Sequence, residues 1–182
     1  MNFLNDVHGE RYQQAYFDDF PGVWRHGDFI KINKRGGCYI QGRSDSTLNR
    51  YGVRIGTAEV YRAVEALDSI QDSLVVCVEC ANGGFFMPLF AELSAGKVLN
   101  EDLKNQINRT LKEICSPRHV PDNIYQVDAI PYTLTGKKLE VPVRKLLQGF
   151  PLEKAASIDS MKNPDSIGYF VEFAEQYVNQ QT

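Results

Sequence analysis

The sequence lacks both long hydrophobic runs and a large excess of charge of one sign. No apolar stretch approaches the roughly 20 residues that span a bilayer, and the first ten residues have neither the basic nor the apolar region of a secretory signal. Because 20 basic residues stand against 23 acidic ones, the net charge is −3, without the basic excess typical of nucleic-acid-binding proteins. We therefore expect a cytoplasmic protein that binds neither membranes nor nucleic acids, although a local basic patch could still bind phosphates.

Cysteine is scarce as well. Cys38, Cys77, Cys80 and Cys115 are too few and too scattered for the disulfide framework of a small secreted protein. Cys77 and Cys80 form a C-x-x-C within a β-branched stretch, but no second such pair and no histidine pair at zinc spacing accompanies them. The sequence favours small buried side chains here over a redox or metal pair, and we expect no metal site.

What the sequence contains is a globular composition, with 43% hydrophobic and 24% charged residues, arranged in three parts. Residues 1–43 end in two short strands joined by a glycine turn. Because an isolated hairpin is marginally stable, we expect this part to be the edge of a larger structure or to need a partner surface. Residues 44–148 predict a compact α+β domain, a small sheet with packed helices. Residues 149–182 predict a helical extension, with a helix over 165–179.

The middle part alternates helices and strands. Apolar residues at helical spacing predict helices that begin at Thr57 and Asn100, each of which we expect to be an N-cap. Strand-like segments with turn signals between them cover 70–79, 85–93 and 124–127. Residues 130–138 predict a loop, because they combine Pro131, two threonines and Gly136 before two lysines.

Gly136 and Lys137 invite comparison with a nucleotide phosphate loop. That motif needs a glycine where Pro131 stands and Ser or Thr where Lys138 stands, so we expect no Walker-type site. What remains is a lysine on a loop that can reach a ligand, next to a glycine that lets the backbone approach the ligand closely. Taken alone, such a pair is more often a solvated turn.

Two further segments carry side chains suited to a nucleotide. Residues 42–59 hold Arg43, Arg50 and Arg54 among glycines just before a helix, and guanidinium groups bind phosphates bidentately. A basic surface turn explains this composition equally well. Asp28, after a glycine, could accept hydrogen bonds from sugar hydroxyls, although turn closure is the simpler interpretation.

The three segments occur in one order and spacing, and with this pattern the chain resembles the C-terminal part of the adenylate-forming acyl-CoA synthetases. The matched motifs are Gly27-Asp28, Gly42-Arg43-Ser44-Asp45, Gly52 to Glu59, and Pro131 with Thr135-Gly136-Lys137. Within this family it is most similar to the acetoacetyl-CoA synthetases, through residues 46–52, 133–143 and 166–173. The resemblance implies the fold of that family's mobile C-terminal domain, preceded by a hairpin of its large domain.

The resemblance also implies nucleotide contacts and a catalytic residue. Asp28 would bind the ribose of ATP, Arg43 would contact its ribose or phosphate side, and Arg54 would contact a phosphate during adenylation. Lys137 would be catalytic, bridging the substrate carboxylate and the α-phosphate. A lysine there stabilises a transition state in which like charges meet.

Two more residues would serve the movement of the domain. Asp45 would be the hinge about which it rotates, and Gly52 would lie against the pantetheine channel while the thioester forms. Many members of the family carry a second acidic residue at Ser46 and a lysine at Asn49, and this departure suggests contacts specific to the subgroup.

By the same resemblance, a large N-terminal domain supplies the ATP phosphate loop, the acyl pocket and most of the Mg²⁺ binding, and it would be the partner of this chain. We expect a fragment or remnant of an acid–thiol ligase that adenylates acetoacetate with ATP and transfers the acyl group to CoA, and that has little activity alone. A non-catalytic binding module with the same fold, or a ligase for another short-chain acid such as acetate, remains an alternative. A nucleic-acid binder built around Arg43, Arg50 and Arg54 is disfavoured, because aromatic residues are not interleaved with these arginines.

Overall fold

The computed structural model describes residues 6–44, 47–80 and 83–181. The chain divides into two compact units, Met1–Ser44 and Asp45–Thr182. Within the described residues, no helix is both long enough and apolar enough to cross a membrane.

The first unit contains a short helix and a hairpin. Helix α1 (Glu10–Tyr16) is held at its start by the buried carboxylate of Asp6, which accepts hydrogen bonds from the backbone N–H groups of Arg11 and Tyr12. Strands β1 (Asp28–Ile32) and β2 (Cys38–Arg43) pair antiparallel. The glycine-turn hairpin is thus confirmed, whereas α1 was not predicted because its sequence has no apolar periodicity.

The hairpin turn is built by Asn33 and two glycines. The Asn33 side-chain oxygen accepts hydrogen bonds from the backbone N–H groups of Arg35 and Gly37, each at 2.9 Å. Gly36 has a φ of 80°, a left-handed conformation that favours glycine. The paired Ile30 and Ile40 are 53% and 68% exposed, so one face of this two-stranded sheet is bare within its unit.

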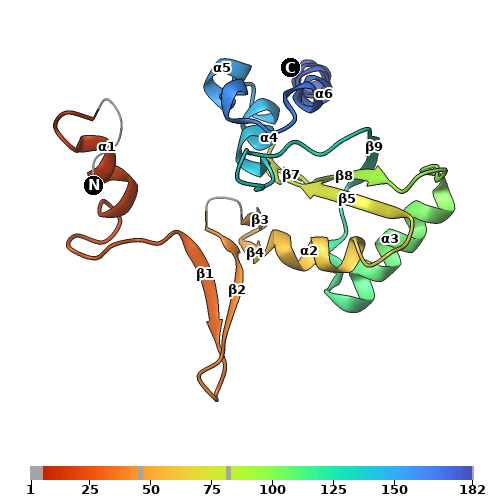
Figure 1. Ribbon diagram of the computed structural model, residues 1–182. Helices are drawn as coiled ribbons and strands as arrows, with labels where there is room; N and C mark the ends of the chain where they lie inside the picture. Colours follow the sequence, from red (N-terminus) through yellow and green to blue (C-terminus); the bar gives the residue numbers. More distant parts are fainter. Residues whose placement is uncertain (1–5, 45–46, 81–82, 182) are drawn as a thin grey trace. The chain divides into compact units, whose positions relative to one another are not determined.

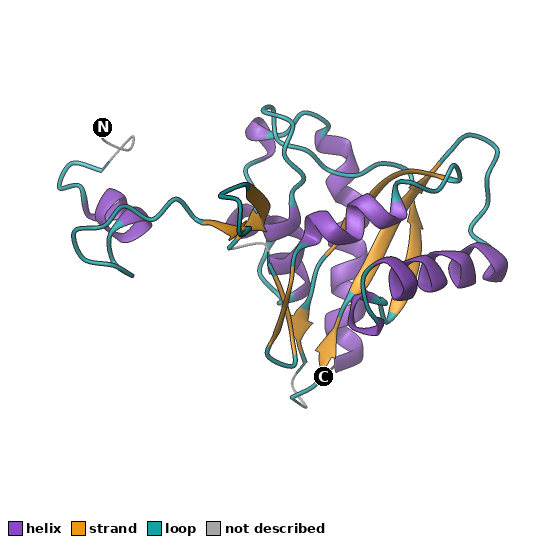
Figure 2. Ribbon diagram, turned by 90° about the horizontal axis from the view of Figure 1, so that it is seen from below, coloured by secondary structure: helices purple, strands orange, loops and turns teal. Residues whose placement is uncertain are grey.

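The second unit is built on a three-stranded sheet of order β5-β8-β9. Strand β5 (Ile70–Val75) pairs antiparallel with β8 (Pro88–Leu93), and β8 pairs parallel with β9 (Asn123–Val127). Helices α2 (Thr57–Val64) and α3 (Glu101–Ile114) cover one face, and α4 (Glu140–Leu147), α5 (Leu152–Ala155) and α6 (Ile167–Gln181) lie on the other side (Figure 1). Figure 2 shows the helices and strands from a second direction. The predicted α+β fold with helices packed on a small sheet is confirmed.

Alternation along β8 explains why both faces are covered. Leu89 and Ala91 belong to the core beneath α2 and α3, whereas Phe90 belongs to the core beneath α4 and α6. Successive strand residues point to opposite faces, and all three side chains are fully buried. The sheet therefore has an apolar core on each side, and two layers of helices are needed to exclude water from it.

Three small elements complete the second unit. Strands β3 (Leu48–Arg50) and β4 (Val53–Ile55) form a tight hairpin across Tyr51 and Gly52, whose φ angles are 52° and 76°. A turn whose two central residues both have positive φ matches the right-handed twist of the strands that a two-residue loop joins. Strands β6 (Val78–Glu79) and β7 (Phe85–Phe86) pair antiparallel. Single 3₁₀ turns lie at Pro117–His119, Ile158–Ser160 and Pro164–Ser166.

Two expected features need correction or refinement. Thr57 is not the N-cap of α2: Gly56 holds that position and the Thr57 side chain is buried, whereas Asn100 does cap α3 by accepting a hydrogen bond from Leu103 N–H at 2.9 Å. Cys77 is buried as expected, and Cys80 is only partly buried, with its Sγ 3.3 Å from the Tyr177 hydroxyl.

Candidate functional site

Lys137 lies at the tip of the loop between β9 and α4. Thr133 closes the loop: its N–H donates to the Lys137 carbonyl at 2.8 Å, and its hydroxyl accepts from the Lys137 N–H at 3.0 Å. Gly136 has a φ of 78°, and its N–H donates to the Thr133 carbonyl at 2.9 Å. The Lys137 side chain is exposed, and no ion-pair partner for it lies among the described residues.

The next residue, Lys138, has the opposite environment. Its Nζ lies 2.6 Å from a carboxylate oxygen of Glu65 and 2.6 Å from one of Asp72, and it donates to the Ser73 carbonyl at 2.6 Å. It also lies 3.9 Å from the centre of the Tyr61 ring. Only 15% of the side chain is exposed, so Lys138 anchors the loop and Lys137 alone of the two is presented to a ligand.

Two tyrosines extend this anchor. The Tyr132 hydroxyl donates to Asp72 at 2.7 Å, and the Tyr61 hydroxyl donates to Glu140 at 2.6 Å. Burial, followed by the hydrogen bond to Asp72, raises the pKa of Tyr132. Burial, followed by the charge of Glu140, raises the pKa of Tyr61 well above its ordinary value. Both phenols therefore stay protonated and act as hydrogen-bond donors at neutral pH.

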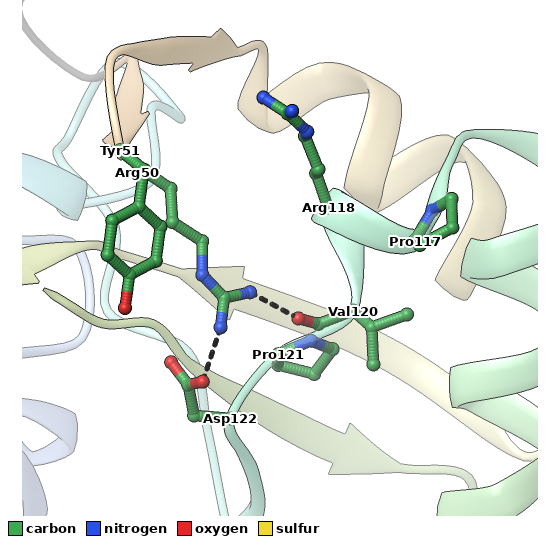
Figure 3. A pocket seen from close by; sticks show the side chains of 7 residues that line it. All are labelled: Arg50, Tyr51, Pro117, Arg118, Val120, Pro121 and Asp122. Carbon is green, nitrogen blue, oxygen red and sulfur yellow. Dashed lines mark hydrogen bonds and ion pairs between the residues drawn. The ribbon is translucent and has the colours of Figure 1, made fainter. Parts of the chain in front are cut away.

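The arginines before α2 have different environments. The guanidinium of Arg50 donates to the Val120 carbonyl at 2.7 Å and forms an ion pair with Asp122, whose other oxygen accepts from the Met87 N–H (Figure 3). Arg50 thus joins β3 to the segment before β9. Arg54 lies on β4 and is exposed.

A hollow of about 620 Å³ lies beside this ion pair, lined by seven residues: Arg50, Tyr51, Pro117, Arg118, Val120, Pro121 and Asp122. The Arg118 side chain extends away from Asp122 (Figure 3). Gly52, next to Tyr51, is exposed, and a Cβ built there would meet no atom within 4 Å. Among the described residues, none comes close enough to constrain a side chain at Gly52, and its positive φ favours glycine.

In the first unit, the register of the hairpin places Asp28 opposite Arg43. The Asp28 carboxylate is paired with His26. The Ser44 N–H and hydroxyl both donate to the Gly27 carbonyl, at 2.7 and 3.1 Å, which closes the open end of the hairpin. The expected hinge residue, Asp45, lies outside the described residues. The hairpin register therefore places Asp28 and Arg43 at opposed backbone positions, and Lys137 and Arg54 belong to the other unit.

No protein-family profile matches the chain. An acetoacetyl-CoA synthetase of Caenorhabditis elegans is 44% identical over 174 residues, which are 94% of this chain and 24% of that protein. The structure of the Streptomyces lividans acetoacetyl-CoA synthetase matches with 49% identity and a TM-score of 0.89, over 96% of this chain and 26% of that one. The chain belongs to the acetoacetyl-CoA synthetase family. It corresponds to the C-terminal part of these synthetases and spans about a quarter of their length.

More distant adenylate-forming enzymes share the fold. The ATP-bound structure of MatB from Rhodopseudomonas palustris matches with a TM-score of 0.63 at 22% identity, over 77% of this chain and 27% of that one. At this identity the likeness concerns the fold alone. Membership of the acetoacetyl-CoA synthetase family therefore rests on the closer relatives, which match nearly the whole chain.

The groups that anchor Lys138 beside Lys137 were not found from the sequence. Asp72, Glu65 and Tyr132 carry no motif, and nothing in the pair Lys137-Lys138 says which ammonium is anchored. The only sequence signal at Arg50 was its position in an arginine-rich segment, and Arg54 has the same signal. These roles depend on partners far away in the sequence, such as Glu65, which lies 73 positions from Lys138.

Proposed function

We propose that this chain is the C-terminal portion of an acid–thiol ligase that activates acetoacetate with ATP and passes the acyl group to CoA. The observation that carries the proposal is the presentation of Lys137: an exposed lysine at the tip of a loop whose neighbouring lysine is anchored. The high identity to acetoacetyl-CoA synthetases over nearly the whole chain supports it.

The first half-reaction explains what such a lysine does. The acetoacetate carboxylate attacks the α-phosphorus of ATP, a carboxyl oxygen–phosphorus bond forms, and pyrophosphate leaves as its bond to that phosphorus breaks. Because the attacking group and the phosphate are both anionic, an ammonium between them stabilises the transition state, and removing such a group costs on the order of 10² or more in rate. In this proposal, Asp28, Arg43 and Arg54 contact the nucleotide.

The second half-reaction does not need Lys137. The CoA thiolate attacks the acyl carbonyl, a carbon–sulfur bond forms, and AMP leaves with the electrons of the carbon–oxygen bond. Rotation about Asp45 would exchange Lys137 for Gly52 at the acyl-AMP, which would let one site carry out both steps in turn. ATP and CoA are then co-substrates, with Mg²⁺ held mainly by the large domain.

The partner of the chain in this proposal is the large domain of the same enzyme. The bare face of the β1–β2 hairpin supports this, because Ile30, Ile32 and Ile40 are each more than half exposed. Apolar strand side chains in this number usually pack against another surface. The acyl pocket and the ATP phosphate loop would come from that partner.

A chimera tests the proposal. The matching quarter of the Streptomyces lividans enzyme is replaced by this chain, and Lys137→Ala is compared with the exposed control Lys97→Ala. We expect Lys137→Ala to abolish acetoacetate-dependent ATP–pyrophosphate exchange and to leave CoA transfer onto supplied acetoacetyl-AMP nearly unchanged. An equal loss of both activities would contradict the role of Lys137.

A second measurement addresses the alternative of a binding module. Calorimetry of the isolated chain with ATP should detect no tight binding, because the phosphate loop and adenine pocket belong to the partner domain. Tight binding of ATP by the chain alone would show that it is an independent nucleotide-binding module.

A further inference from the structure

The Lys137 loop contacts a distant segment of the chain along its backbone. Residues 158–163 follow α5 and run beside residues 130–134. The Leu134 N–H donates to the Ser160 carbonyl at 2.9 Å, and the Lys162 N–H donates to the Tyr132 carbonyl at 2.9 Å. Thr133 forms an antiparallel bridge with Met161 between these two bonds. The C-terminal extension therefore pairs with the loop as a short additional strand would.

Asn163 adds a two-point side-chain contact at the base of the loop. Its Oδ1 accepts a hydrogen bond from the Tyr132 N–H at 2.9 Å, and its Nδ2 donates to the Ile130 carbonyl at 2.8 Å. These two backbone groups flank Pro131, which has no N–H of its own to donate. One amide side chain thus fixes the backbone on both sides of the proline with which the loop begins.

The pairing segment is itself held in the core. Met161 is only 5% exposed and belongs to the same buried cluster as Leu139, Val143 and Phe170. Those residues lie at the start of α4, within α4 and within α6. Because the segment is fixed by this packing, its hydrogen bonds restrain the loop rather than follow it.

The far side of the loop is held by Lys138 and by the hydroxyl of Tyr132, both bound to Asp72. The loop is therefore held on one side by the C-terminal extension and on the other by Asp72. In its tip, Leu134 to Lys137, every residue is exposed. The position of a catalytic side chain matters at this scale, since a displacement of about 1 Å can cost on the order of 10² in rate.

We propose that the C-terminal extension positions Lys137 for adenylation, with Asn163 as a positioning residue. This inference rests on the proposed role of Lys137 in the first half-reaction. All the contacts lie within the unit Asp45–Thr182, so the loop keeps its shape as the unit moves. Asn163 acts only through the loop and touches no reacting atom.

The test uses the same chimera with Asn163→Ala. We expect the turnover of ATP–pyrophosphate exchange to fall about 10- to 100-fold, the loss that misplacement of a reacting group brings. CoA transfer from supplied acetoacetyl-AMP should stay within about twofold, because Lys137 has no part in it. The matched control is Asn105→Ala, on the exposed side of α3, which should change neither activity.

Three outcomes are distinguishable. If Asn163→Ala lowers both half-reactions together with the thermal midpoint, the residue is merely structural and the inference is wrong. If Lys137→Ala abolishes exchange while Asn163→Ala leaves it intact, the inference is wrong and the proposed function stands. If Lys137→Ala itself leaves exchange intact, the proposed function fails.

A second variant covers the case in which the alanine variant does not fold. Asn163→Asp keeps the acceptor for the Tyr132 N–H and loses the donor to the Ile130 carbonyl. It should again reduce ATP–pyrophosphate exchange and spare CoA transfer, and the loss should be accompanied by faster hydrogen exchange at the Leu134 amide, which pairs with the Ser160 carbonyl. If Asn163→Asp leaves the turnover of ATP–pyrophosphate exchange unchanged, Asn163 is not a positioning residue for Lys137.

Discussion

Lys137 and Lys138 are adjacent in the sequence and have opposite environments in the fold. The Lys138 ammonium lies 2.6 Å from carboxylate oxygens of both Glu65 and Asp72, whereas the Lys137 side chain is exposed. Anchoring one lysine determines the direction in which the backbone presents the other. The same chemical group therefore serves stability at one position and is available for a ligand at the next.

Replacing the anchored lysine should destabilise the chain far more than replacing the exposed one. Lys138→Met leaves two partly buried carboxylates without a counter-charge, and breaking such a pair costs about 3 kcal/mol. Lys137→Met should change the free energy of unfolding by less than about 0.5 kcal/mol, as surface substitutions do. Urea unfolding of the two variants measures the difference, and equal destabilisation would show that the anchor contributes little.

Arg50 should behave as a structural residue. Arg50→Gln removes the ion pair with Asp122 and the hydrogen bond to the Val120 carbonyl, and lost hydrogen bonds of charged groups cost about 2–3 kcal/mol. Arg118→Gln, whose exposed side chain lines the same hollow, serves as the control and should have little effect. Equal urea midpoints for the two variants would contradict a structural role for Arg50.

Gly136 should be required for its conformation rather than for space. A Cβ there would meet no atom within 4 Å, yet φ is 78°, so Gly136→Ala should cost about 1–2 kcal/mol through backbone strain alone. Gly168, in the first turn of α6, also has open space and no positive φ. Gly168→Ala should stabilise by up to about 1 kcal/mol. Thermal unfolding of both variants tests whether the two changes in stability have opposite signs. Destabilisation by both would show that the space for a Cβ, not φ, limits substitution at these glycines.

Stability should fall in alkaline solution, partly through Cys77. Burial raises the pKa of the Cys77 thiol from 9.0 to about 11. Below pH 9 the thiol is protonated in both the folded and the unfolded chain, so it favours neither. Between pH 9 and 11 the unfolded chain releases this proton more readily, so the free energy of unfolding decreases as pH rises.

Urea midpoints measured from pH 8 to 11 test this. Cys77→Ala should reduce the slope in that interval, whereas Cys38→Ala, at an exposed position, should leave it unchanged. Cys115 and the tyrosines contribute to the slope that remains, since burial also raises the pKa values of Cys115, Tyr61 and Tyr132. Identical slopes for parent and Cys77→Ala would contradict the raised pKa.

The sequence determined much of the fold because periodicity is a local property. Spacing in α3 specifies which of its side chains are buried whatever the partner is, and alternation along β8 specifies the face of the sheet on which each side chain lies. Asn100 caps α3 through its own neighbours. The turn at Gly136 is local for the same reason. The composition of residues 130–138, with Pro131 and Gly136, likewise predicted a loop that carries Lys137. Helix α1 and the β3–β4 hairpin lack such periodicity and were not predicted.

Only the tertiary structure decided which of the similar charged residues are anchored and which are exposed. Arg50 and Asp122 are separated by 72 positions, Lys138 and Glu65 by 73, and Tyr132 and Asn163 by 31. Such pairs form when the sheet and its two helical layers bring distant segments together, and no local pattern encodes them. Because a charged side chain is stabilised by its partners rather than by its own identity, the fold distinguishes Lys137 from Lys138 and assigns Asn163 to the Lys137 loop.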